Sequence, residues 1–188
     1  KSNIEIYRKI IIFPFLIFEG IHYSNDIKFL IKNLSKKDAE KIVLVEKISL
    51  IEEILPLTSQ IYREMLSNKK DLILVTCSSF SKKKSVILNL KKYTKLLAKN
   101  LGIDSCYFHF SGDEKNIIEK IKKDNHSKTH SIFFHPLFLF QGYLYQKSSK
   151  VFSDTFKSDI KIAGPLMNQP NIYRLVINRL VSRIQTID

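Results

Sequence analysis

The sequence predicts an α/β protein made of two similar, doubly wound units with parallel sheets, the first unit being incomplete. Two observations support this. Short apolar runs alternate with longer amphipathic stretches along all 188 residues, as in chains whose strands and helices alternate. In addition, one apolar stretch near the N-terminus recurs with changes in the second half, which indicates an internal duplication.

The duplicated stretch covers residues 10–23 and returns as residues 132–145. Each copy combines an apolar run, a proline and a glycine-bearing loop. The copies differ at one informative position, where the first has His22 and the second has Leu144. The residues that coincide at a constant offset are Pro14 with Pro136, Phe18 with Phe140, Gly20 with Gly142 and Tyr23 with Tyr145.

Six runs rich in Ile, Val or Phe are expected to be strands. They are almost continuously apolar, which is typical of parallel strands buried on both faces. The expected strands are residues 10–13, 42–45, 72–75, 106–110, 132–134 and 160–163.

Amphipathic helices are expected between these strands. Apolar residues three and four apart predict a helix over residues 85–101, which Ser85 can cap and Gly102 can end. Further helices are expected near Asp113, after Pro56 and after Pro170.

The order of these elements gives the expected domains. Residues 71–188 contain a complete unit, whereas residues 1–68 contain only its later portion. By this register the first copy lacks its opening strand, helix and second strand, so we expect an N-terminally truncated chain.

Composition restricts the partners. The net charge of +13 favours an anionic partner, which leaves nucleic acid, an acidic membrane surface and a polyanionic small molecule open. No run reaches the roughly 20 apolar residues of a membrane span. Cys77 and Cys106 do not form a CxxC pair, and reduced thiols in the cytoplasm are the expected interpretation.

Polar residues that follow the strands are the candidates for chemistry, because ligands of doubly wound sheets bind at the carboxyl ends of the strands. His22 is the leading candidate, since neutral imidazole can bind a metal and accept a proton near pH 7; an ordinary loop histidine is the alternative. His135 is expected to be structural. His109 should face away from its two Phe neighbours, with a functional role left open. His126 and His130 are expected to be solvated.

The segment 76–81, Thr-Cys-Ser-Ser-Phe-Ser, follows an expected strand and precedes an expected helix. Its hydroxyl and backbone N–H groups could hold a carboxylate or phosphate at the helix N-terminus. The alternative is simple helix capping by Ser81 or Ser85. The spacing of the histidines does not by itself define a metal site.

The loop over residues 13–22, followed by Asn25-Asp-Ile27, and its second copy over residues 136–142 resemble the class II chelatases. The closer resemblance is to the long form of the sirohydrochlorin chelatase family CbiX, in which a histidine ends the first loop only. Further likeness lies in Phe110-Ser-Gly112 and in residues 163–166, Ala-Gly-Pro-Leu.

This resemblance implies two similar α/β domains facing a cleft that binds sirohydrochlorin, an anionic tetrapyrrole. It implies insertion of Co²⁺ or Fe²⁺, as in cobalamin or siroheme biosynthesis, with His22 as both metal ligand and catalytic proton acceptor. It implies no cofactor beyond the substrate metal ion, and no membrane. The family's other active-site histidine, in a Gly-His-Gly-Ser motif, has no counterpart in this sequence.

Two alternatives stay open at this point. A basic, non-catalytic module could bind nucleic acid, with Tyr93, Tyr143 and Tyr145 stacking on bases. That interpretation is disfavoured because the aromatic residues mostly fall on apolar runs. The chain could also be an inactive, truncated relative of the chelatases.

Overall fold

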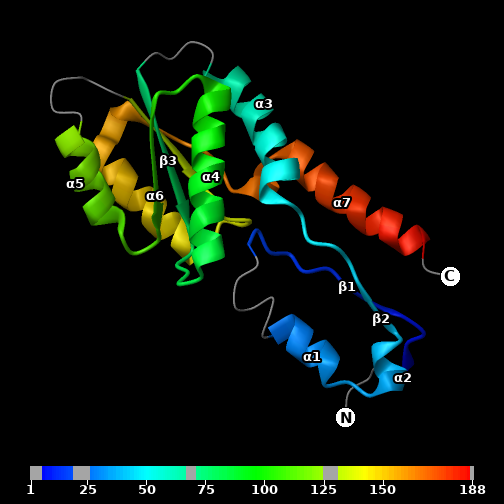
Figure 1. The fold of residues 1–188 in the computed structure, drawn as a ribbon. Coiled ribbons are helices and arrows are strands. Elements are labelled where there is room, and N and C mark those ends of the chain that lie inside the picture. Colours follow the sequence, from blue (N-terminus) through cyan, green and yellow to red (C-terminus); the bar gives the residue numbers. More distant parts are fainter. Residues whose placement is uncertain (1–5, 19–25, 67–70, 125–130, 187–188) are drawn as a thin grey trace. The chain divides into compact units, whose positions relative to one another are not determined.

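The computed structural model describes residues 6–18, 26–66, 71–124 and 131–186 (Figure 1). By its internal contacts the chain divides into two compact units. The first comprises Lys1–Ser49 with Arg174–Asp188, and the second is Leu50–Tyr173. This division differs from the repeats expected at 1–68 and 71–188, because the contacts assign the helix that ends each repeat to the other unit. The repeat boundaries themselves stay a prediction.

The second unit contains a four-stranded parallel sheet in the order β4-β3-β5-β6. The central strand β3 is flanked on both sides, and its residues from Ile73 to Ser78 are buried. Such burial explains why these strands read as continuous apolar runs. The strands are β3 (Leu72–Ser78), β4 (Ser105–Phe110), β5 (Ser131–Pro136) and β6 (Ile160–Ile162).

The first unit contains a parallel pair, β1 (Ile10–Ile12) and β2 (Ile42–Leu44), with the short helices α1 (Lys28–Lys32) and α2 (Lys36–Ala39). All six expected strands are therefore confirmed, as is an α/β chain with two parallel sheets. Arg179 belongs to this unit through α7 (Pro170–Gln185), and its guanidinium donates to the Lys47 carbonyl at 2.6 Å.

The duplication is visible in the backbone hydrogen bonds. Ile10 pairs with Ile42 in the first unit, and Ile132 pairs with Ile160 in the second. The carbonyls of the matching residues Ile12 and Phe134 each accept from the residue after the next strand, at 2.9 and 2.8 Å. Both prolines, Pro14 and Pro136, accept from the backbone N–H two residues later at 2.9 Å. The two copies therefore fold alike up to the start of their loops.

Two expected helices begin earlier than their sequences suggest. Helix α4 is Lys84–Leu101, with Lys83 as its N-cap residue, so Ser85 is not the cap. Ser81 Oγ instead accepts from the Lys83 N–H at 3.2 Å, in the turn before the helix. At the other end Gly102 adopts the expected left-handed conformation, with φ of 67°.

Helix α3 is Leu55–Leu66, and a π-helical segment, Leu50–Ile54, leads into it. Pro56 therefore lies inside the first turn and does not precede the helix. Pro56 has no backbone N–H, so it cannot donate to a carbonyl of the preceding π-helical segment.

The two faces of the larger sheet differ in chemistry. Helices α5 (Glu114–Asp124) and α6 (Tyr143–Phe156) cover one face, where an apolar cluster includes Val75, Phe134 and Phe152. The rings of Phe134 and Phe152 stack there with centroids 4.3 Å apart. Helix α4 covers the other face (Figure 1), where Tyr93 and other buried polar side chains lie.

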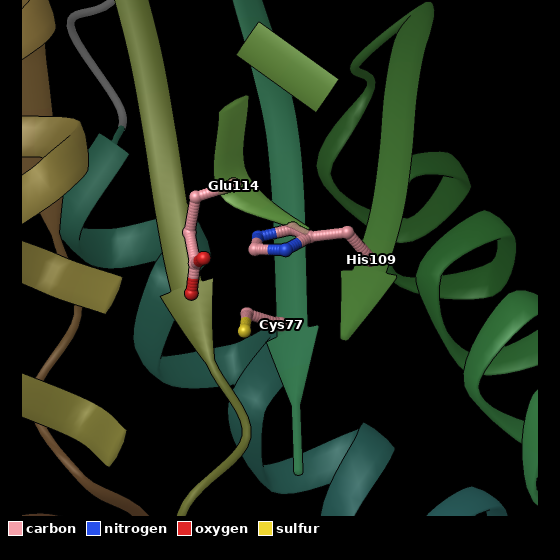
Figure 2. Close-up of side chains that lie close together, drawn as sticks. All are labelled: Cys77, His109 and Glu114. Carbon is pink, nitrogen blue, oxygen red and sulfur yellow. The ribbon is translucent and has the colours of Figure 1, made fainter. Parts of the chain in front are cut away.

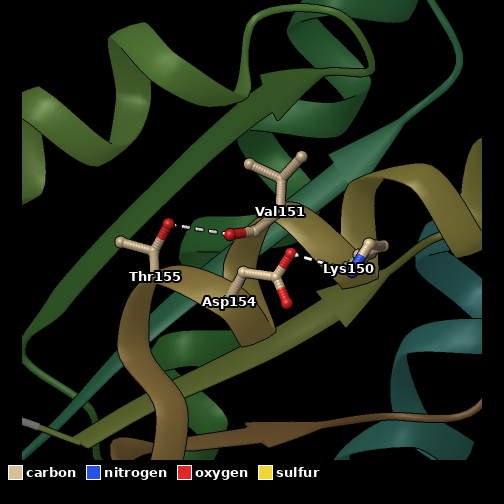
Figure 3. Close-up of polar contacts among 4 residues, drawn as sticks. All are labelled: Lys150, Val151, Asp154 and Thr155. Atoms are coloured by element: carbon tan, nitrogen blue, oxygen red, sulfur yellow. Dashed lines mark hydrogen bonds and ion pairs between the residues drawn. The ribbon is translucent and has the colours of Figure 1, made fainter.

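The outer side of α6 carries polar contacts (Figure 3). Lys150 Nζ and Asp154 Oδ2 form an exposed ion pair at 3.0 Å, one helical turn apart. Thr155 Oγ1 donates to the Val151 carbonyl at 2.8 Å. Exposed pairs of this kind contribute little to stability, so the buried side of α6 holds it on the sheet.

We expect Gly102→Ala to lower the free energy of unfolding by about 1–2 kcal/mol, because a Cβ is strained in the left-handed conformation. A Cβ at Gly102 would meet nothing within 4 Å, so the backbone alone causes the loss. Gly164→Ala is the matched control, since its Cβ would make only an ordinary 3.9 Å contact. Urea unfolding of the two variants measures this. Equal free energies of unfolding for the two variants would contradict the left-handed conformation of Gly102.

Candidate functional site

His22 lies outside the described residues, as do His126 and His130. The roles expected for these three histidines from the sequence therefore stay predictions. The histidines that the structure describes, His109 and His135, lie in the second unit on neighbours of the central strand. They lie on opposite faces of the sheet and have very different surroundings.

His135 is 0% exposed and bonded on both sides. Its Nδ1 lies 2.9 Å from Tyr62 Oη, and its Nε2 lies 3.0 Å from Tyr93 Oη. A neutral imidazole has one donor and one acceptor, so one tyrosine donates to the ring and the other accepts from it. Burial lowers the pKa of His135 to about 3. The ring is neutral and fully bonded, which agrees with the structural role expected for it.

Cys77 and His109 are brought together on the other face by the sheet register. The two residues are direct partners in the parallel pairing of β3 with β4. Partners in adjacent strands point to the same face, so the thiol and the imidazole both lie on the side covered by α5 and α6. His109 thus faces away from Phe108 and Phe110, as the alternation predicted.

The imidazole of His109 is held in one orientation. It is 2% exposed and stacks on Phe134 and Phe152, with centroids 6.0 and 5.4 Å away. Its Nδ1 lies 3.1 Å from the Phe110 carbonyl, which can only accept, so Nδ1 carries the proton. Burial lowers the pKa of His109, although the Phe110 carbonyl and nearby carboxylates oppose this. The ring is therefore neutral, with a lone pair on Nε2.

Glu114 opens α5 and brings a buried carboxylate to the same place. Gly112, whose φ of 105° suits glycine, turns the chain so that its N–H donates to the carboxylate at 3.0 Å. Ser148 Oγ from α6 donates to Glu114 Oε1 at 2.6 Å. Burial raises the pKa of Glu114, but these hydrogen bonds outweigh burial and leave the pKa below its ordinary value. The carboxylate is therefore ionised near pH 7.

The thiol of Cys77 is protonated in this environment. Burial raises its pKa to about 12, with the Ser148 hydroxyl acting in the opposite direction and Glu114 adding to the rise. Its Sγ lies 3.7 Å from Ser148 Oγ. Cys77 is thus an inert thiol unless a cation replaces its proton.

Together these three side chains form a compact group of possible ligands. Cys77 Sγ, one ring nitrogen of His109 and one oxygen of Glu114 all lie within 4.8 Å of one another. Figure 2 shows the three side chains extending toward a common point from β3, β4 and the start of α5. We refer to them below as the Cys-His-Glu cluster. The sequence analysis considered Cys77 and His109 separately and missed Glu114, although the cysteine and the histidine each lie one residue before the end of adjacent strands.

The segment 76–81 only partly fits the anion site expected there. Strand β3 continues to Ser78, so Thr76 and Ser78 are buried strand residues and do not belong to a loop. The Thr76 hydroxyl bonds Thr94 on α4. Ser81 accepts from the Lys83 N–H in the turn before α4, but α4 has no side-chain cap, so the alternative of capping by Ser81 or Ser85 is also wrong.

Comparison with known proteins identifies the fold. Residues 3–65 match the model of the CbiX family. The chain has the class II chelatase fold. It is similar to the structure of CbiX, described as the terminal enzyme for biosynthesis of siroheme in denitrifying bacteria, with a TM-score of 0.67 and 11% identity. That similarity covers 96% of this chain and 77% of the other.

A second similar structure is the sirohydrochlorin chelatase SirB from Bacillus subtilis subspecies spizizenii, in complex with cobalt. Its TM-score is 0.61 at 15% identity, over 93% of this chelatase-fold chain and 68% of that chain. No curated protein sequence matches the chain. The resemblance to class II chelatases expected from the sequence is confirmed. Among the described residues, no helix has the length and apolar character needed to cross a membrane.

The His135 network predicts a specific dependence of stability on pH. The folded-state pKa of about 3 lies below the ordinary histidine pKa of 6.5, so the unfolded chain binds a proton first as the pH falls. Stability is complete above the unfolded value and is lost as the pH falls toward the folded value. The loss from this residue is at most about 1.4 kcal/mol per pH unit.

His135→Gln should flatten that dependence between roughly pH 6.5 and 5, because glutamine does not titrate. The measurement is the free energy of unfolding by urea at several pH values, for the variant and the unmodified chain. The same slope in both proteins would show that His135 does not titrate as the structure indicates.

Proposed function

We propose that this chain inserts a divalent metal, Co²⁺ or alternatively Fe²⁺, into sirohydrochlorin, with His22 as the metal ligand and proton acceptor. The observation that carries the proposal is the CbiX match over residues 3–65, since it spans the loop that bears His22. The two similar structures are of a terminal enzyme of siroheme biosynthesis and of a sirohydrochlorin chelatase.

The repeat gives independent support for the position of His22. The matching residue in the second copy, Leu144, lies in the first turn of α6 and is 39% exposed. The hydrogen bonds that precede the loop are the same in both copies, at Pro14 and at Pro136. In the second copy this position is open to solvent, and only the first copy has an imidazole at the matching place in the sequence.

The proposed reaction needs a ligand and a base but no electron transfer. As the metal forms bonds to the four ring nitrogens of the tetrapyrrole, two pyrrole N–H protons leave, and the metal gives up its protein ligand. An imidazole released from the metal is neutral and can accept one of those protons near pH 7, and the second proton passes to water. The metal ion is a substrate of this reaction, and no further cofactor is required.

The charge of the chain suits the proposed substrate. Sirohydrochlorin carries several carboxylates, and a chain with a net charge of +13 attracts polyanions over distances set by the salt concentration. Cytoplasmic placement is also part of the proposal, supported by the unlinked thiols of Cys77 and Cys106.

His22→Ala should slow metal insertion by about 100-fold or more, the usual contribution of a positioned acid or base. The assay follows the absorption change of sirohydrochlorin on adding Co²⁺, and separately Fe²⁺ under anaerobic conditions. His126→Ala is the matched control and should retain the rate. Undiminished insertion by His22→Ala would overturn the role of His22, and no insertion by the unmodified chain would overturn the proposed activity.

Binding of sirohydrochlorin should weaken as salt is added, because carboxylates and lysines are screened. The dissociation constant, measured by quenching of tetrapyrrole fluorescence, should rise several-fold between low and physiological ionic strength. A neutral tetrapyrrole ester serves as the comparison and should show little salt dependence. Binding that is insensitive to salt for both compounds would contradict the electrostatic part of the proposal.

A further inference from the structure

A buried ring nitrogen in the second unit has no hydrogen-bond partner in the part of the chain that the structure describes. His109 Nε2 makes no hydrogen bond within the described residues, although the side chain is 2% exposed. Buried polar atoms nearly always make a hydrogen bond. An exception needs an explanation, such as local strain, a catalytic role, or a bound water or ion. Its counterpart on the other face, His135, has both ring nitrogens bonded.

The unpartnered nitrogen belongs to a side chain of the Cys-His-Glu cluster, in which Cys77 Sγ, one ring nitrogen of His109 and one oxygen of Glu114 lie within 4.8 Å of one another. In a tetrahedral site with ordinary bond lengths, neighbouring ligand atoms are about 3.3–3.7 Å apart. Side-chain motion that shortens the distances between these ligand atoms by about 1 Å would let all three bind one ion.

We propose that Cys77, His109 and Glu114 form a binding site for a zinc- or cobalt-type divalent cation in the second unit. The site goes beyond the proposed function, because it lies on other residues than His22 and needs no tetrapyrrole.

Thiolate, imidazole and carboxylate together select the class of ion. A sulfur ligand disfavours the hard ions Mg²⁺ and Ca²⁺, which prefer oxygen. One sulfur, one nitrogen and one oxygen suit borderline ions that accept four ligands, above all Zn²⁺ and Co²⁺. The hydroxyl of Ser148 contacts both Cys77 and Glu114 and is a candidate for a fourth ligand.

The surroundings already have the arrangement that metal ligands need. The Nδ1–H of His109 donates to the Phe110 carbonyl, as a ligating histidine commonly does, and this directs the Nε2 lone pair away from the strand. Glu114 is oriented by Gly112 and Ser148. On binding, the S–H bond of Cys77 breaks, an S–metal bond forms, and the proton passes to solvent.

Rigid backbone supports the same site. The Cys77 carbonyl accepts from the Leu137 N–H at 2.7 Å, and the Ser78 carbonyl accepts from the Ser111 N–H at 2.8 Å. These bonds hold the ends of three strands together around the cluster. With all three side chains buried, the site resembles closed structural metal sites more than open catalytic ones.

Titration of the reduced, metal-free full chain with Co²⁺ under anaerobic conditions tests the site. Binding through Cys77 should give a near-ultraviolet thiolate-to-cobalt absorption that saturates at one ion per chain, and added Zn²⁺ should remove it. No such absorption in the unmodified chain would overturn the proposal, whether or not the variants fold.

Matched variants locate the ligands. Cys77→Ser and His109→Gln should lose most of the absorption, whereas Cys106→Ser should retain it, since Cys106 is the other cysteine of the chain. His22→Ala should also retain it, which separates this site from the proposed chelatase residue. Loss of the absorption in Cys106→Ser or in His22→Ala would contradict the assignment of the metal ligands. Circular dichroism of each variant shows whether a loss of the cobalt absorption comes from misfolding. If a variant misfolds, the titration of the unmodified chain decides whether the site exists.

Discussion

The second unit depends on the parallel register of its central strand. Because β3 pairs with β4 on one side and β5 on the other, two adjacent residues of β3 meet the two described histidines. Thr76 pairs with His135, and Cys77 pairs with His109. Side chains of adjacent residues in a strand point to opposite faces, so the same register sends one histidine to each side of the sheet.

The surroundings on each face then decide what each histidine can do. On the α4 side, Tyr62 and Tyr93 use both ring nitrogens of His135, which leaves a neutral, structural ring. On the α5–α6 side, aromatic stacking and one backbone carbonyl fix His109 but leave Nε2 unpartnered. Burial disfavours the charged form of both rings, yet only His109 keeps a lone pair open to a cation.

The strands could be predicted from the sequence because both faces of a buried parallel sheet demand continuous apolar runs. The duplication could also be recognised in the sequence, and the equivalent hydrogen bonds at Pro14 and Pro136 agree with it. The predicted N-cap of α4, Ser85, was wrong, since a serine close to a helix end need not be its cap. Glu114 could not be found this way, because its approach to Cys77 depends on strand register and on Ser148 from another helix.

The measurement that tests this account most directly is imidazole nitrogen NMR of the metal-free chain near pH 7, before and after addition of Zn²⁺. The account predicts that His109 is neutral, with its proton on Nδ1 and an unprotonated Nε2 whose resonance moves when Zn²⁺ binds. A proton on Nε2, a charged ring, or an Nε2 resonance that ignores Zn²⁺ would contradict it.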